Sequence, residues 1–428
     1  MSRADAFGHH GARPALGVLL LLSSLLGACG AVRVTPDAQG VTVEPGPCGR
    51  GVVVVQSDYQ SSNVSLIDFD GQVLSESLIS SSAESSGFGV RLSGDVVAPT
   101  SAQNGPEIVL IDRYPAGVLR FVELATARVT AELSVATGFR ANPQDYLLLG
   151  PGRAYVARYE TNANPGREDW DGGGDVLVVD PSVPAITGRI DLSAALANES
   201  SKFSPHPARL LDVSGRIFAV LSAYAADYSS AAESRLVELD PETDTLRSTL
   251  VLDGLRGCSA LAVSPDERTL AVACTGDDLR STQPKLDGSG LALIDIEGAP
   301  RLGQRFEASQ LADTALGFGV SYAAPERLLF STLGHFDESG APAAQDALLL
   351  LHTDSGVVEE LLQSAGEPFT LGGARCSATC GLCFVADAKR SGGSVLRFAV
   401  DSAGDFAAPS EIRVETRVGL PPRYLGVF

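Results

Sequence analysis

The stretch DWDGGGD, residues 169–175, concentrates the side chains of this chain that are best suited to bind a cation. Asp169, Asp171 and Asp175 offer carboxylate oxygens, the ligands that Ca2+ prefers, and the glycines allow the backbone to curl around an ion. No helices are predicted beside it, so it is not an EF-hand. The sequence establishes no cofactor, and a solvated acidic loop is the favoured interpretation. The alternative is a Ca2+ site formed by Asp169, Asp171 and Asp175.

Carboxylates and aromatic side chains also gather in three later segments. The loop that contains Asp169 and Asp171 and these three segments together form what we call the acidic wall. It comprises residues 161–174, 223–233, 275–289 and 335–345. Loops on a rigid scaffold are where binding groups usually lie, so we expect the wall to bind a protein or a carbohydrate. The predicted binding residues are Asp169, Trp170, Asp171, Tyr224, Asp277, Asp278 and His335.

Residues for catalysis are few. The motifs G-x-S-x-G, H-E-x-x-H and C-x-x-C-H do not occur in the sequence. Cys376, Cys380 and Cys383 match the spacing of a radical-enzyme iron-sulfur site, but such a cluster needs a reducing compartment and lies early in an α/β barrel. A metal-dependent, lactonase-like periplasmic hydrolase, built from carboxylates and His335 around a central channel, is the enzymatic alternative.

The charge of the chain argues against one class of partner. The formal net charge is −20 at pH 7. A surface of this sign repels phosphate backbones, so we expect no nucleic-acid partner.

Residues 1–28 have the layout of an export signal. Arg13 precedes an apolar run from Leu16 to Leu26 that is too short to span a membrane. The sequence LGAC, residues 26–29, resembles the lipobox of bacterial lipoproteins. The resemblance implies cleavage before Cys29, a palmitate-bearing lipid on Cys29 and, because Gly30 is not Asp, an outer-membrane location on the periplasmic side or the cell surface. Membrane contact would then be made only by the lipid, and residues 29–50 would form a flexible tether. Ordinary cleavage and secretion is the alternative.

Seven stretches such as NVSLIDFDG and GLALIDIEG recur along the chain at intervals of roughly 55 residues, which indicates a repeat architecture. One aligned column holds a residue suited to open a turn, because an Asp side chain can accept a bond from the backbone two residues on. These carboxylates are therefore predicted to be structural. The column contains Asp68, Glu123, Asp180, Asp240, Asp295, His352 and Asp401.

Each repeat reads as four short antiparallel strands with little room for helix. The first repeat lacks its leading strand, and the chain ends in a spare one, PPRYLGVF. The predicted fold is all-β: a seven-bladed β-propeller over residues 51–428, whose C-terminal strand joins the first blade and closes the ring. The segments VSPDERTLAVA and GLALIDIEG resemble repeats of YVTN-type seven-bladed propellers, a family that includes lactonase-like and surface-layer proteins. The resemblance implies the fold and says little about activity.

The remaining six cysteines are predicted to pair, because an exported protein meets an oxidising compartment. Cys258 and Cys274 stand at opposed positions about one turn, with Ala260 opposite Val272. Cys376 would face Cys383, and Cys48 with Cys380 would staple the first blade to the seventh. Pairing of Cys48 with Cys376 or Cys383 stays open.

The sequence thus favours a cell-envelope lipoprotein whose propeller is a binding or scaffold module acting through the acidic wall. The lactonase-like hydrolase is the main alternative. A third hypothesis is a propeller with a purely structural role in an envelope complex.

Overall fold

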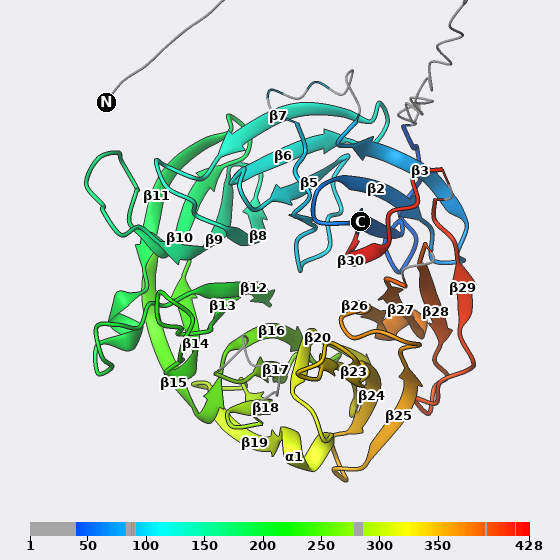
Figure 1. The fold of residues 1–428 in the computed structure, drawn as a ribbon. Coiled ribbons are helices and arrows are strands. Elements are labelled where there is room, and N and C mark those ends of the chain that lie inside the picture. Colours follow the sequence, from blue (N-terminus) through cyan, green and yellow to red (C-terminus); the bar gives the residue numbers. More distant parts are fainter. Residues whose placement is uncertain are drawn as a thin grey trace, which may run out of the picture. The chain divides into compact units, whose positions relative to one another are not determined.

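Seven groups of four short strands make up the part of the chain that the structure describes, as the repeats predict (Figure 1). The strands are rich in Val, Ile and Leu, whose side chains pack well on a pleated surface. The computed structural model describes residues 40–82, 87, 89, 91–277, 286–389, 392–415 and 417–428. The predicted signal, Cys29 and the first half of the tether lie outside the described residues, and so does Asp278. Among the helices that are described, none has the length and apolarity to cross a membrane.

The seven sheets follow the chain in order, and each is antiparallel. The first blade contains β30 (Pro422–Val427), β1 (Val52–Ser57), β2 (Ser62–Ile67) and β3 (Val73–Ser80), and the second contains β4 (Val96–Val97), β5 (Glu107–Asp112), β6 (Val118–Glu123) and β7 (Arg128–Ser134). The third contains β8 (Pro143–Gly150), β9 (Arg153–Thr161), β10 (Gly173–Asp180) and β11 (Ala185–Asp191), and the fourth contains β12 (Pro207–Val213), β13 (Arg216–Leu221), β14 (Glu233–Asp240) and β15 (Thr245–Arg256).

The last three blades repeat this pattern. They contain β16 (Cys258–Val263), β17 (Thr269–Thr275), β18 (Ser289–Asp295) and β19 (Arg301–Glu307); then β20 (Leu316–Ala324), β21 (Arg327–Thr332), β24 (Ala347–His352) and β25 (Val358–Gln363); then β26 (Leu371–Ser377), β27 (Leu382–Asp387), β28 (Ser394–Ala399) and β29 (Ser410–Ile412). The short elements between them are a hairpin of β22 (His335–Phe336) and β23 (Pro342–Ala344), and the helical turns η1 (Ser193–Leu196), α1 (Ala308–Leu311) and η2 (Ala378–Cys380).

The ring closes as predicted, by pairing of the last strand with the first. β30 is antiparallel to β1, with Leu425 opposite Val54 and Val427 opposite Val52. Phe428 is fully buried in a core shared by the first two blades. The C-terminal strand is therefore the innermost strand of the first blade.

The turn column has the structural role that the repeats predict in four blades. Asp180, Asp240, Asp295 and Asp401 each accept a hydrogen bond from the backbone N–H two residues on. The other three positions use different partners: Asp68 accepts from the N–H of Gln72, Glu123 from the hydroxyl of Thr126, and His352 contacts Glu359.

The disulfides Cys258–Cys274, Cys376–Cys383 and Cys48–Cys380 are all formed, which confirms the predicted pairing. The predicted register within β16 and β17 is wrong by one residue. A bulge between Cys258 and Ala260 places Ala260 opposite Ala273, because one strand carries an extra residue there.

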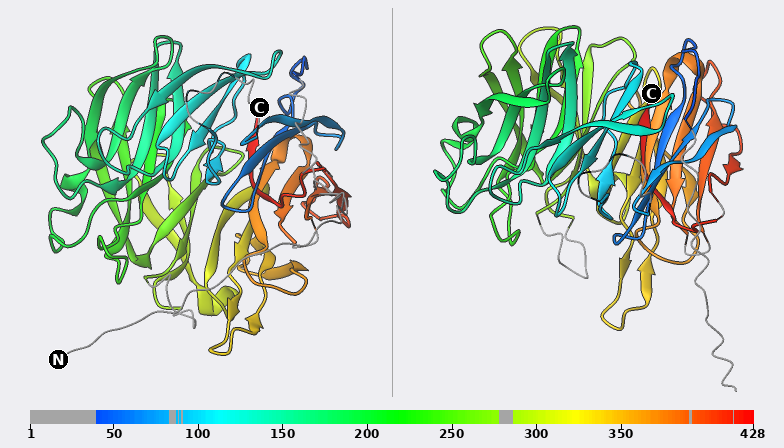
Figure 2. Two further views of the ribbon diagram at one scale, coloured as in Figure 1. Left: turned by 45° about the horizontal axis from the view of Figure 1, so that its top comes forward. Right: turned by 90° about the horizontal axis from the view of Figure 1, so that it is seen from above.

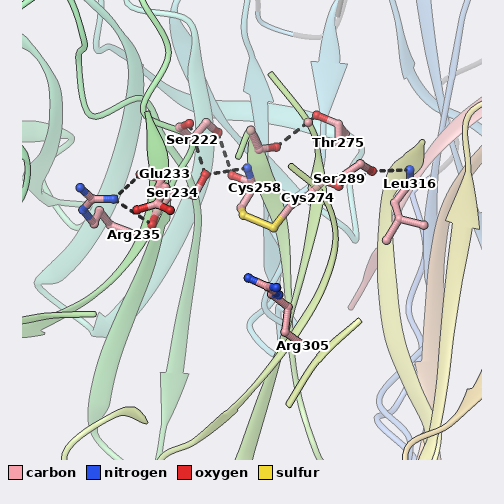
Figure 3. Close-up of a disulfide and its surroundings, with 12 residues drawn as sticks. Ser222, Glu233, Ser234, Arg235, Cys258, Cys274, Thr275, Ser289, Arg305 and Leu316 are labelled. Carbon is pink, nitrogen blue, oxygen red and sulfur yellow. Dashed lines mark hydrogen bonds between the residues drawn. A yellow bond between two sulfur atoms is a disulfide. The ribbon is translucent and has the colours of Figure 1, made fainter. Parts of the chain in front are cut away.

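Serine side chains link the Cys258–Cys274 disulfide to both neighbouring blades (Figure 3). Ser222 Oγ donates to the carbonyl of Cys258 at 2.8 Å, and Ser289 Oγ donates to that of Cys274 at 2.9 Å. Ser289 Oγ in turn accepts from the N–H of Leu316 at 2.9 Å. The fourth, fifth and sixth blades are thereby linked by hydrogen bonds at the level of this disulfide.

The antiparallel order gives the ring two different faces. Connections from the second strand of a blade to the third, and from one blade to the next, lie on one face, which we call the loop face. Connections from the first strand to the second, and from the third to the fourth, lie on the opposite face, which we call the turn face. In the right view of Figure 2 the β22–β23 hairpin projects from one side and the C-terminus lies toward the other. The acidic wall therefore belongs to the loop face.

Residues 40–50 cross the turn face, and we call them the entry strap. The N–H of Val41 donates to the carbonyl of Leu124, and Arg50 donates to the carbonyls of Asn104 and Gly105 at 3.0 and 2.8 Å. Cys48 is bonded to Cys380 in the first turn of the seventh blade. The chain thus enters the propeller on the face opposite to the acidic wall.

Candidate functional site

Asp175, a predicted calcium ligand, is instead part of a buried ion pair. Arg158 Nε and Nη2 donate to its two carboxylate oxygens at 2.8 and 2.7 Å, and both side chains are at most 1% exposed. The guanidinium also donates to the hydroxyl of Thr137 and to the carbonyl of Trp170. Asp175 therefore holds the acidic wall loop to the blade.

Asp171, the second predicted ligand, organises its own loop. Its carboxylate accepts from the N–H groups of Gly166, Arg167 and Glu168, and these bonds lower the pKa of Asp171 below its usual value. Asp169 is exposed. Among the residues that the structure describes, no three His, Cys, Asp or Glu side chains form a group that could hold a metal ion. Asp171 and Asp175 are thus engaged by protein donors, and calcium binding at this loop stays a prediction.

The other predicted binding residues of the wall are also used mainly within the fold. Tyr224 is 1% exposed, and its hydroxyl donates to the carbonyl of Gly276 at 2.8 Å. Asp277 pairs with Arg256, and His335 is half-buried in the β22–β23 hairpin. Trp170, which is 39% exposed, is the predicted aromatic group that solvent reaches.

Behind the wall, four aromatic rings form a cluster that the sequence did not predict. The ring of His206 lies 4.7 Å from that of Tyr159, 5.6 Å from Tyr228 and 6.3 Å from Tyr224. The imidazole is 1% exposed, and this burial lowers the pKa of His206 to about 4. His206 is therefore neutral at physiological pH and packs as an aromatic side chain.

The buried imidazole makes the propeller sensitive to acid. The pKa of His206 is lower in the folded chain than the usual 6.5, so its contribution is complete above pH 6.5 and is lost as the pH falls toward 4. We expect a loss of about 2 kcal/mol in the free energy of unfolding between pH 7 and pH 5 from this group. Urea titrations at both pH values should show a smaller pH dependence in His206→Asn, since Asn tolerates the positive φ of this position. An equal pH dependence in both proteins would contradict this assignment.

The innermost strands of all seven blades surround a cavity of about 180 Å³ in the central channel. β30, β4, β8 and β12 line one part of it, and β16, β20 and β26 line the rest. Glycines on β20 and β26, among them Gly319, Gly372 and Gly373, leave room between the strands. The cavity is thus a product of the ring and not of any one blade.

Three aromatic side chains stand at the mouth of this cavity. Tyr59, Phe318 and Phe369 line it and are 58%, 50% and 52% exposed. Tyr59 follows β1 and Phe369 precedes β26, so the mouth opens on the loop face. Phe336 of the β22–β23 hairpin lies 6.2 Å from the ring of Phe369, which extends the aromatic rim toward the acidic wall.

The interior of the cavity is basic. Arg209, Arg375 and Arg423 line it together with Gln144 and Tyr424. Arg423 braces the rim: it donates to the carbonyls of Ser57 and Phe369 and lies 4.7 Å above the Tyr59 ring. The described residues that line the cavity include no carboxylate, imidazole or thiol.

These cavity residues were not among the predicted binding residues, although the sequence carries a signal for two of them. The strand sequences LGGARCS and PRYLGV each carry one charged residue, an arginine, among small and apolar neighbours. A lone arginine on an innermost strand points either into a blade interface or toward the channel. Which of the two directions it takes depends on how the blades are arranged around the ring.

Comparisons with known proteins identify the fold. No family model and no curated protein sequence matches the chain, so the YVTN resemblance stays a prediction. Among solved structures, the 6-phosphogluconolactonase-like protein of Bacteroides fragilis has a TM-score of 0.55 at 12% identity, covering 89% of this chain and 99% of that one. The periplasmic gluconolactonase of Pseudomonas aeruginosa has a TM-score of 0.52 at 13% identity, covering 88% and 98%. At these identities the likeness shows a seven-bladed β-propeller with lactonase-like structural neighbours, and no activity.

Proposed function

We propose that this chain is a binding propeller that takes a small organic ligand into its central cavity from the loop face. The observation that carries the proposal is the cavity mouth, where Tyr59, Phe318 and Phe369 are each about half exposed. Concave sites lined by apolar and aromatic groups with a few polar ones are the usual form of a small-molecule site. Large exposed aromatic side chains in one place indicate a surface that another molecule covers.

The cavity supports binding better than the acidic wall or hydrolysis. Asp171 and Tyr224 of the wall, and Asp175 next to it, hold loops in place. A lactonase must activate water with a metal ion or a general base. The described residues of the cavity supply arginine, amide and hydroxyl groups instead.

The lipid anchor is part of the proposal. With a lipid on Cys29, the protein would be held at the outer membrane through the entry strap, which lies on the turn face. The cavity mouth opens on the opposite face, where a ligand can enter without meeting the strap. Palmitate labelling of the full chain tests the anchor: Cys29→Ser should abolish both the label and membrane association.

The cavity is tested with N-phenyl-1-naphthylamine, an uncharged aromatic dye whose fluorescence rises on binding. The wild-type protein should bind it, and the double variant Phe318→Ala/Phe369→Ala should weaken binding about tenfold, because each aromatic contact contributes about 0.5 to 1.5 kcal/mol beyond the area buried. Trp170→Ala is the control, since it removes an aromatic side chain that is 39% exposed from the wall. Loss of binding in Trp170→Ala alone would place the site on the acidic wall and overturn the proposal.

A further inference from the structure

We propose that the ligand of this cavity carries an anionic headgroup, a carboxylate or a phosphate monoester, bound by Arg209 and Arg375. The inference rests on the proposed function and names the chemical class of its ligand. Four observations carry it: the position of the two arginines on the cavity lining, their lack of an ion-pair partner, the backbone hydrogen bonds that hold the nearby Asp145, and the apolar wall between the arginines and the mouth.

The two arginines reach the cavity from blades on opposite sides of the ring. Arg209 lies on β12 and Arg375 on β26, and both line the cavity. Figure 1 shows these strands facing each other across the middle of the ring. The charge of Arg209 reaches Arg375, since repulsion from Arg209 contributes to the lowered pKa of Arg375, while Asp145 acts in the opposite direction.

Within the described chain, neither guanidinium is paired with a carboxylate. Arg209 donates to the carbonyls of Ala208 and Gln144 at 2.7 and 3.5 Å. Arg375 donates to the carbonyl of Ala374 at 3.0 Å, and its Nε is buried without a partner. A buried charge without a partner is costly, so such a group in a cavity indicates a site for a counter-ion.

Asp145 acts on both arginines through its charge, but its carboxylate is hydrogen-bonded to the backbone. Asp145 accepts from the backbone N–H groups of Thr100, Tyr146 and Leu210, each at 2.9 Å. Asp95 pairs with Arg113 at 2.5 Å. The described lining of the cavity therefore holds three arginines and no carboxylate, in a chain whose formal net charge is −20. Burial, together with repulsion from Arg209, lowers the pKa of Arg375 to about 10, and burial also lowers the pKa of Arg209.

The walls between the arginines and the mouth are apolar. Leu261, Val320 and Leu371 line the cavity together with the rim residues Phe318 and Phe369. An arginine fork matches the two oxygens of a carboxylate or phosphate, and apolar walls match a hydrocarbon or aromatic body. The geometry therefore fits an anion attached to an apolar ring.

Two dyes that share one aromatic body separate the charge effect from the cavity itself. 8-Anilinonaphthalene-1-sulfonate carries a sulfonate, and N-phenyl-1-naphthylamine carries no charge. Wild-type protein should bind the sulfonate at least tenfold more tightly, because hydrogen bonds between charged groups are stronger than those between neutral ones. Arg375→Gln should remove most of this preference and leave the affinity for the neutral dye within twofold, while Arg375→Lys should keep part of it.

Arg128→Gln is the matched control. It makes the same change of charge at an exposed position on β7, an outermost strand, and should alter neither affinity. Phenylacetate and phenyl phosphate as competitors identify the headgroup: displacement of the sulfonate dye by either one, but not by benzyl alcohol, supports the inference. Displacement by neither would overturn it.

The results distinguish this inference from the proposed function. If wild-type protein bound the two dyes with equal affinity, or if Arg375→Gln weakened the binding of both dyes equally, the inference of an anionic ligand would be overturned. The cavity would remain the binding site. Affinities that do not respond to Phe318→Ala/Phe369→Ala would overturn the proposed function itself. Thermal unfolding tests whether the variant is folded. The melting temperature of Arg375→Gln should be no lower than that of wild type, because the substitution removes a buried charge that has no ion-pair partner. A clearly lower melting temperature would make Arg375 a structural residue and overturn the inference.

Discussion

Removal of residues 421–428 is expected to abolish the single cooperative unfolding transition of this protein. The truncation deletes β30, the innermost strand of the first blade, and with it the fully buried Phe428. It also leaves Val52 to Val55 of β1, all fully buried in the intact ring, on an open sheet edge. A domain is stable by about 5 to 15 kcal/mol, so the loss of a strand from two cores exceeds what the ring can tolerate. Calorimetry with far-UV circular dichroism measures the effect.

Two point variants serve as references for the effect of the truncation on stability. Phe428→Ala should lower the free energy of unfolding by about 3 to 5 kcal/mol, since it opens a cavity in the core of the first two blades. Val418→Ala, at a position that is 39% exposed just before β30, should change it by no more than about 0.5 kcal/mol. A truncated chain that melts like its parent would mean that β30 does not close the ring.

Asp175→Ala is expected to cost about 3 to 5 kcal/mol of stability, because it leaves the charge of Arg158 buried without its partner. The loss should be the same in EDTA and in millimolar Ca2+, since the carboxylate is used by Arg158 and not by a cation. Urea unfolding under both conditions measures it. Asp169→Ala, at an exposed position of the same loop, is the control and should have little effect.

A different outcome would restore the calcium hypothesis. If Asp175→Ala were nearly neutral in EDTA and strongly destabilising only with Ca2+, the loop would bind a cation in solution. The ion pair with Arg158 would then be an arrangement of the ion-free chain.

Arg158 and Arg375 show how one residue type takes two roles in the same ring. Arg158 has a bidentate carboxylate partner and further acceptors, so it stabilises the fold. Arg375 has one carbonyl acceptor and a buried Nε without a partner, so removing it should not harm the ligand-free protein. The hydrogen-bond acceptors of each guanidinium thus distinguish a structural arginine, Arg158, from a candidate binding residue, Arg375.

The sequence by itself determined the features that depend on local pattern. The repeats, the turn-opening Asp180 and Asp240, and the spare C-terminal strand follow from strand periodicity and turn chemistry, which act over a few residues. The pairing of Cys258 with Cys274 follows as well, because both lie about one turn. The one-residue bulge beside Cys258 did not, since a bulge changes the register without changing the pattern.

Only the tertiary structure decided which side chains meet. Arg209, Arg375 and Phe318 come from three blades, and nothing in the local pattern of any blade says that they share a cavity. The same holds for Asp175, whose spacing in a glycine-rich stretch fits a calcium loop but whose partner, Arg158, comes from the neighbouring strand. Period-two patterning tells which face of a sheet a residue occupies. The angle at which seven sheets meet around an axis decides what that residue touches.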